Sequence, residues 1–185
     1  LTNNTLLPNH DMQQFRPRPN GGRIVHSIND RIPTYQLASL YRSADCFVSS
    51  TRGEGWGMPM LEAMACGLPV IATNWSAQTD FMNERNSYPV DVARLVPADA
   101  PCPFYKGFKW AEPSYEHLRV QMRHVYENRQ EARRKGEIAS QEALSKWTWG
   151  HSARKIIQRL EQIELSRPGI GGRFASPATA LAIHA

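Results

Sequence analysis

The sequence lacks the features that would place the chain in a membrane or outside the cell. Nothing in its 185 residues approaches the roughly 18 consecutive apolar residues of a membrane-spanning helix. The first residues have neither the basic start nor the apolar run of a signal peptide. Cysteine is scarce: there are three, an odd number whose spacing fits no metal or redox motif. We therefore expect a cytoplasmic protein from a reducing compartment.

The net charge of +5 is compatible with a nucleic acid, an anionic lipid surface or a phosphorylated ligand as a partner. Its distribution argues against the first two. Basic residues such as Arg129, Arg133, Arg134 and Lys135 alternate with glutamate in the second half of the chain, which is typical of a solvated helix face. The sequence shows no pattern of a common nucleic-acid module, and we expect no nucleic-acid binding.

The length leaves room for one α/β domain with a real core. Proline and glycine are dense at the end of residues 1–22, which favours a linker or the remnant of a preceding region. We expect the folded domain over 23–165. Residues 166–185 show no periodicity, and we expect them to be disordered.

A βαβ unit is predicted near the middle of the chain. Asp45–Ser49 and Pro69–Thr73 are short apolar runs that suit buried strands. Between them, Pro59 suits the first turn of an apolar helix and Gly67 suits the residue just past its end. Parallel strands are expected from such a unit, and ligands bind at their carboxyl ends. The loop Ser50–Pro59 follows the first strand at that end.

Other elements follow from periodicity and caps. One helix is expected from Pro33 and another from Pro113, with short strands and loops over 74–112. Asn128 and Glu131 are spaced as a capping box for the next helix. We expect Trp110, Trp147 and Trp149 to be packing anchors between the last helices. The final helix carries Ala153, Ile156, Ile157, Leu160 and Ile163 on one face. That apolar face could pack on a partner or make a peripheral membrane contact.

The segment most informative about chemistry is residues 54–73, EGWGMPMLEAMACGLPVIAT. Gly55 and Gly57 leave backbone amides uncovered just before a helix N-terminus, an arrangement that binds anions such as a diphosphate. The carboxylates of Glu54 and Glu62 flank this loop. An ionised carboxylate only accepts hydrogen bonds, so it suits pairs of sugar hydroxyls rather than phosphate.

At these residues the sequence resembles the donor-binding signature of retaining glycosyltransferase family 4. That signature is two glutamates separated by seven residues, with Gly-aromatic-Gly after the first and a proline inside. Glu54 and Glu62 match it, as do the residues Gly55, Trp56, Gly57 and Pro59. The flanks 37–53 and 63–73 are also similar, and the resemblance extends over roughly 24–165.

The resemblance implies a Rossmann-like parallel sheet with flanking helices, the C-terminal half of a GT-B glycosyltransferase. It implies transfer of a hexose from a UDP-, GDP- or ADP-sugar to a glycan, lipid or small acceptor with retention of configuration. Glu54 would contact the donor sugar and is the candidate catalytic residue. Glu62 would hold the ribose. The residues between them that would meet the sugar and diphosphate are Gly55, Trp56, Gly57, Met58 and Pro59.

The same resemblance sets further expectations. The loop Asn29–Pro33, with Arg31 and Ile32, would lie near the base. No metal or other cofactor is implied, and the sequence has no Asp-x-Asp. The basic Arg–Lys pair of the family has no match here. In a GT-B fold the last helix often packs on an N-terminal acceptor domain, which this chain would need for activity. The alternative is a truncated, non-catalytic nucleotide-binding or interaction module.

Overall fold

The computed structural model describes residues 31–98 and 103–166. The chain divides into two compact units, Leu1–Thr34 and Tyr35–Ala185. The expected linker at 1–22 and the expected disordered tail beyond Ser166 lie outside the described residues. The following description concerns the second unit.

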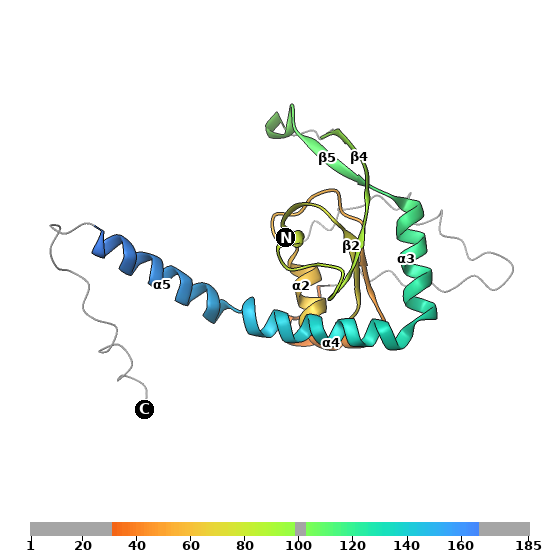
Figure 1. Ribbon diagram of the computed structural model, residues 1–185, viewed down its shortest axis with the longest axis horizontal. Helices are drawn as coiled ribbons and strands as arrows, with labels where there is room; N and C mark the ends of the chain where they lie inside the picture. The colour runs from red at the N-terminus through yellow and green to blue at the C-terminus, as the bar shows by residue number, and fades with distance from the viewer. Residues whose placement is uncertain (1–30, 99–102, 167–185) are drawn as a thin grey trace, which may run out of the picture. The chain divides into compact units, whose positions relative to one another are not determined.

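A parallel three-stranded sheet forms the centre of this unit (Figure 1). Its strands are β1 (Phe47–Ser49), β2 (Val70–Thr73) and β3 (Tyr88–Val90), in the order β1-β2-β3. Helix α2 (Met58–Ala65) connects β1 to β2. The predicted βαβ unit is therefore confirmed, with Phe47 paired to Val70 in the parallel register.

Burial is concentrated in β2 and α2. All four residues of β2 are buried, and Met60 and Met64 of α2 are 1% exposed. These side chains were expected in the core because the helix sequence is apolar nearly all round. Strand β1 differs from its prediction as a buried strand, because Val48 is 40% exposed.

Helix α4 (Arg129–Lys146) packs on α2 through small residues. The Ser140 hydroxyl donates a hydrogen bond of 2.9 Å to the carbonyl oxygen of Ala65. A Cβ at Gly136 would collide with the carbonyl oxygen of Gly67, so the helix approaches this turn as closely as its backbone allows. Gly67 itself has φ +81°, the left-handed conformation expected of a helix C-terminus.

One predicted helix start is wrong, and the start after Asn128 is confirmed without its predicted side-chain cap. Pro113 ends strand β5 instead of opening α3 (Tyr115–Glu127), and the hydroxyl of Ser114 accepts from the His117 amide as the cap. Asn128 precedes α4, but its side chain donates to the His124 carbonyl and so closes α3. The two helices are joined so closely that the side chain satisfies the end of one rather than the start of the next.

The segment 74–113 contains short elements, as expected, and one feature that was not. After β2 comes the 3₁₀ helix η2 (Ser76–Asp80). Strands β4 (Val92–Pro97) and β5 (Lys109–Pro113) then pair antiparallel as a hairpin, with the 3₁₀ helix η3 (Pro103–Tyr105) between them. In sequence this hairpin lies between β3 and α3. Figure 1 shows it extending away from the parallel sheet.

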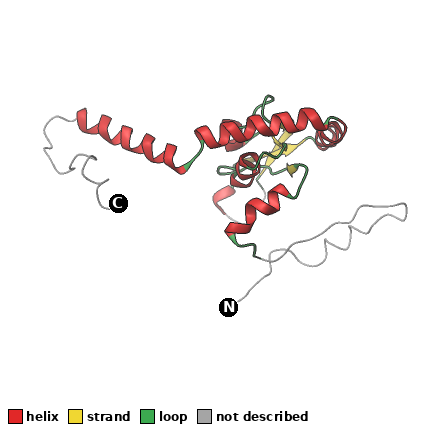
Figure 2. Cartoon of the chain, turned by 90° about the horizontal axis from the view of Figure 1, so that it is seen from below, coloured by secondary structure: helices red, strands yellow, loops and turns green. Residues whose placement is uncertain are grey.

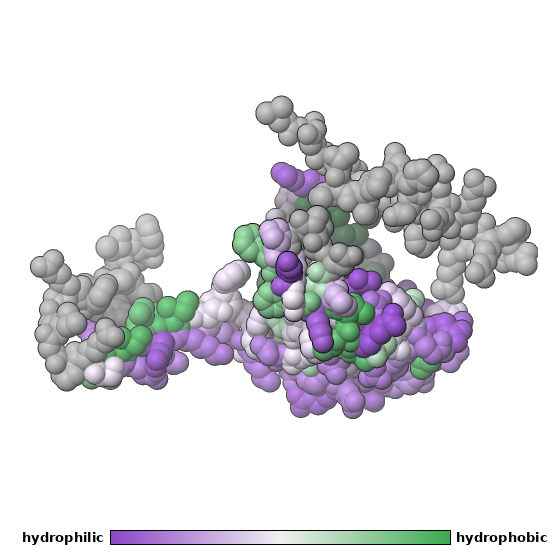
Figure 3. Space-filling model, turned by 90° about the horizontal axis from the view of Figure 1, so that it is seen from above, coloured by the Kyte–Doolittle hydropathy of each residue, from purple (hydrophilic) through white to green (hydrophobic). Residues whose placement is uncertain are grey.

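The unit also includes helices α1 (Thr34–Arg42) and α5 (Trp149–Leu165). Helix α1 begins one residue after Pro33, where its start was predicted. Neither helix has a buried residue. The helices are drawn in red in Figure 2, and apolar side chains gather on α5 in Figure 3. The prediction that three tryptophans anchor the last helices is wrong for Trp149, which is 85% exposed, and for Trp110, which belongs to the hairpin. No described helix is long and apolar enough to span a membrane.

Candidate functional site

The loop between β1 and α2 is shaped by Gly57. This residue has φ +84° and precedes the first turn of α2, where its carbonyl accepts the amides of Met60 and Leu61 at 3.1 and 3.2 Å. A Cβ here would lie 3.3 Å from the Met60 sulfur and 3.5 Å from the Phe81 ring. Both the left-handed backbone and the crowding require glycine. Gly57 therefore ends the loop 50–57 that follows β1, and α2 begins at the next residue.

The N-terminus of α2 has no protein acceptor among the described side chains. No side chain caps the helix, and its first turn contains no acidic residue. Pro59, in that first turn, has no amide to satisfy. The binding of an external anion at this helix terminus stays a prediction.

Glu54 is held by the loop that follows β2. The Ser76 hydroxyl donates a hydrogen bond to the Glu54 carbonyl oxygen at 2.6 Å. The Glu54 amide donates to the Ser76 hydroxyl oxygen at 3.3 Å. Ser76 has φ +68°, and among the described residues no other non-glycine residue has a positive φ. Such a conformation costs free energy and persists only when its surroundings require it. Sequence reasoning missed Ser76, since a single serine in a loop carries no distinctive signal.

Glu62 lies within α2 and faces helix α1. The Tyr41 hydroxyl donates a hydrogen bond of 3.0 Å to its Oε2 atom. Burial raises the pKa of Tyr41 far above its ordinary value, and the nearby Glu62 carboxylate adds to the effect. The sequence indicated that a glutamate inside an apolar helix needs a partner. It did not indicate that this partner would be a tyrosine from an earlier helix.

Trp56 packs inside the protein. Its ring centroid lies 5.6 Å from that of Phe81 and 5.2 Å from that of Trp147. The contact with Trp147 joins the loop to the end of α4, which confirms Trp147 as a packing residue. The ring of Trp56 thus has a structural role, and its contact with a donor stays a prediction.

Glu54 and Gly55 open into a cleft of about 450 Å³. Arg52 and Gly53 from the same loop contribute to its lining, as do two residues after β2 and five from the hairpin. The five hairpin residues are Phe104, Tyr105, Phe108, Lys109 and Trp110. Sequence reasoning missed this hairpin contribution. The available signal was the density of aromatic residues over 104–110, which lie some 50 residues from Glu54 in the chain.

The remaining predicted residues are placed as follows. Met58 is 44% exposed at the start of α2. Arg31 is exposed and Ile32 is half-buried; both fall in the unit Leu1–Thr34, so their position near a base stays a prediction. Asn29 lies outside the described residues. Within 31–98 and 103–166, no group of three or more histidine, cysteine, aspartate or glutamate side chains is arranged to hold a metal ion.

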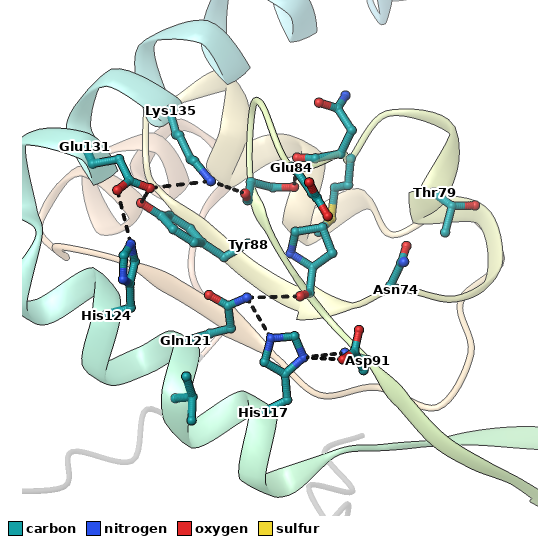
Figure 4. A pocket seen from close by; sticks show the side chains of 15 residues that line it. Asn74, Thr79, Glu84, Tyr88, Asp91, His117, Gln121, His124, Glu131 and Lys135 are labelled. Carbon is teal, nitrogen blue, oxygen red and sulfur yellow. Dashed lines mark hydrogen bonds and ion pairs between the residues drawn. The ribbon is translucent and has the colours of Figure 1, made fainter.

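A second cavity, of about 630 Å³, lies beside β3 (Figure 4). Lys135 places its Nζ 4.0 Å from the Tyr88 ring centroid, and Glu131 accepts from the Tyr88 hydroxyl at 3.2 Å. Burial works to raise the pKa of Glu131, but hydrogen bonds with His124 and Tyr88 outweigh it and lower that pKa. These groups are paired with one another, and they join β3 to α3 and α4.

The fold of this unit is similar to that of a known structure. A parallel sheet with flanking helices, in which a glycine loop leads from a strand into a helix N-terminus, is the Rossmann-like arrangement of the C-terminal half of a GT-B glycosyltransferase. The structure is similar to sucrose-phosphate synthase from Thermosynechococcus elongatus, with a TM-score of 0.53 over 74% of this chain and 30% of that protein. At 22% sequence identity this likeness concerns the fold alone.

Part of the chain is similar in sequence to known glycosyltransferases. Residues 18–106 match the sequence model described as glycosyl transferases group 1. The chain is 46% identical over 53 residues to the O-antigen chain mannosyltransferase B of Escherichia coli. It is 54% identical over 39 residues to the D-inositol 3-phosphate glycosyltransferase of Paenarthrobacter aurescens. The matches cover 29% and 21% of this chain, and only 14% and 10% of those relatives.

Proposed function

We propose that this chain forms the donor half of a retaining glycosyltransferase that transfers a hexose from a nucleotide-diphosphate sugar. The observation that carries the proposal is the junction at Gly57, where an uncapped helix N-terminus follows the carboxyl end of β1 beside the Glu54 cleft. An anionic diphosphate suits that helix end, and the sugar attached to it suits the adjoining cleft.

Three groups divide the donor among them in this proposal. The Glu54 carboxylate accepts hydrogen bonds from the hydroxyls of the hexose. The backbone amides around Gly55–Met58 bind the diphosphate. Glu62 binds the ribose hydroxyls with the oxygen that Tyr41 leaves available. Support comes from the match of 18–106 to the glycosyl transferases group 1 model and from the position of Glu54 in the cleft.

The proposed reaction proceeds on one face of the hexose. The bond between the anomeric carbon and the diphosphate oxygen breaks, and the acceptor hydroxyl oxygen forms its bond on the same face. The departing phosphate takes the proton from that hydroxyl. The protein contributes positioning and stabilisation of charge: the α2 N-terminus stabilises the leaving diphosphate, and Glu54 orients the hexose.

The donor is a UDP-, GDP- or ADP-sugar, and the acceptor is a glycan, a lipid or a small molecule. An N-terminal GT-B domain supplies the opposite wall of the active site. Without it the donor cleft is open to water, and we expect negligible turnover from residues 1–185. The proposed place of action is the cytoplasm, with a peripheral membrane contact if the acceptor is a lipid.

Nucleotide binding by the 185-residue chain tests the proposal. The thermal unfolding midpoint is measured with UDP-, GDP- and ADP-sugars, and we expect one base to raise it. A Glu62→Ala variant should lose most of that increase. Tyr41→Phe is the matched control, because it removes the same hydrogen bond but keeps the carboxylate. An increase of equal size in Glu62→Ala would refute the ribose role, and no increase with any nucleotide would refute donor binding.

A further inference from the structure

We infer that the aromatic residues of the β4–β5 hairpin form a saccharide-binding wall that seats a pyranose ring of the acceptor next to the donor hexose. This inference rests on the proposed function, since it takes the Glu54 side of the cleft as the donor side. It assigns the acceptor a carbohydrate character, at least in the part that enters the cleft.

The first observation is an unusual exposure of aromatic surface. Phe104 is 84% exposed, Phe108 66% and Tyr105 45%. The Tyr105 and Trp110 rings lie 5.6 Å apart at an interplanar angle of 60°. All four side chains line the same cleft as Glu54 and Gly55. Exposed aromatic residues gathered at one cavity are typical of a binding surface.

The second observation is that the hairpin is fixed to the loop that carries Glu54. The Ala111 amide donates to the Arg52 carbonyl at 3.1 Å, and the Arg52 guanidinium lies 3.2 Å from the Glu112 carboxylate. A Cβ at Gly53 would come within 4.0 Å of the Trp110 ring. The aromatic wall therefore has a defined position relative to Glu54, two residues beyond Arg52.

The chemistry of the cleft matches a sugar ring. A pyranose has apolar faces of C–H groups and a rim of hydroxyls. Aromatic rings suit the faces, while Glu54 offers acceptors and Lys109 offers donors for the rim. The cavity of about 450 Å³ is within the size range of small-molecule sites.

The arrangement favours a saccharide over a lipid bilayer. Aromatic and lysine side chains at a hairpin tip also suit a membrane interface. Here, however, they share their cavity with the Glu54 carboxylate, and a bilayer covering that cavity would have to desolvate a charge. A ligand with hydroxyl groups satisfies the same carboxylate.

The test measures saccharide binding to the 185-residue chain by saturation-transfer NMR. The probes are methyl α-mannopyranoside and the corresponding disaccharide at millimolar concentration, with the preferred nucleoside diphosphate present. Replacing one aromatic contact, in Phe104→Ala or Tyr105→Ala, should weaken saccharide binding about fivefold. Tyr105→Phe should retain it, because the ring is preserved. Trp149→Ala is the matched control, since it removes an equally exposed aromatic side chain from α5.

The outcomes separate the two proposals. Nucleotide binding without saccharide binding overturns this inference and leaves the donor proposal intact. Loss of saccharide binding in the hairpin variants with unchanged nucleotide binding supports the inference. If hairpin variants instead bind the saccharide normally but lose binding to phosphatidylglycerol vesicles, the wall is a membrane contact and the inference is wrong. Nucleotide affinity that falls together with saccharide affinity in Tyr105→Ala would assign the wall to the donor sugar and also overturn it.

Discussion

The Tyr41 hydroxyl of α1 donates a hydrogen bond to the Glu62 carboxylate of α2 at 3.0 Å, across 21 residues of sequence. The Tyr41 ring also meets Phe47 of β1 edge-on, with centroids 5.9 Å apart. One side chain thus joins a helix that contains no buried residue to both the helix and the strand of the donor loop.

Removing this hydroxyl should loosen α1. In Tyr41→Phe the ring contact with Phe47 remains, but the hydrogen bond to a charged group is lost. We expect the free energy of unfolding to fall by about 1.5 kcal/mol, measured by urea denaturation. Tyr35→Phe on the same helix is the control, because Tyr35 is 80% exposed. Equal stabilities of Tyr41→Phe and the unmodified chain would show that the bond contributes nothing.

Gly136 is expected to be intolerant of a side chain. Alanine normally stabilises a helix relative to glycine, but a Cβ at this position would collide with the Gly67 carbonyl oxygen. We expect Gly136→Ala to lower the free energy of unfolding by about 1–3 kcal/mol through overpacking of α4 on α2. Gly150→Ala in α5 is the matched control, where the nearest contact to a Cβ is an ordinary 3.6 Å. A stabilised Gly136→Ala would contradict the close approach.

Alkaline pH should destabilise the fold through two tyrosines. Burial raises the pKa of Tyr41 and Tyr88 above the ordinary value of 10.0, and Glu62 and Glu131 respectively add to it. Above pH 10 the unfolded chain releases protons that the folded chain retains, so stability falls as pH rises. The slope of unfolding free energy against pH should be smaller in a Tyr41→Phe/Tyr88→Phe double variant. An unchanged slope would mean that neither hydroxyl is held protonated by folding.

Cys46 should react slowly with alkylating reagents. Burial, together with the neighbouring Asp45 carboxylate, raises the pKa of its thiol to about 12. The thiolate is the reactive form, so little of it exists at neutral pH in the folded chain. Iodoacetamide labelling followed by peptide mass spectrometry should show Cys46 modified far more slowly in buffer than in urea. Equal rates in both conditions would show that the thiol is not protected.

Much of the core followed from the sequence, because its signals are local. The apolar run at Pro69–Thr73 specifies β2, and the proline at 59 and the glycine at 67 specify the start and the end of α2; the structure confirms both elements. Glu54, Gly55 and Gly57 were also identified locally, from spacing and from the backbone freedom of glycine.

The parts that were missed depend on contacts between distant residues. The partner of Glu62 lies 21 residues earlier, and the serine that holds Glu54 lies 22 residues later. The cleft needs the pairing of β4 with β5, which brings Trp110 near Gly53. Asn128 was correctly placed before α4, but its side chain bonds the end of α3, because one side chain can satisfy either of two adjacent helix ends.

The hairpin attaches to this unit at a place where variation has little structural cost. In sequence the hairpin lies between β3 and α3. Among its described residues, only Ala111 and Pro113 at its base are buried. The exposed residues Phe104, Tyr105, Phe108 and Lys109 can therefore change in composition while β2 and α2 keep their packing. If the hairpin binds the acceptor saccharide, exchanging these residues between relatives would change acceptor selectivity without changing the parallel sheet. The hairpin could then be redesigned separately from the rest of the unit.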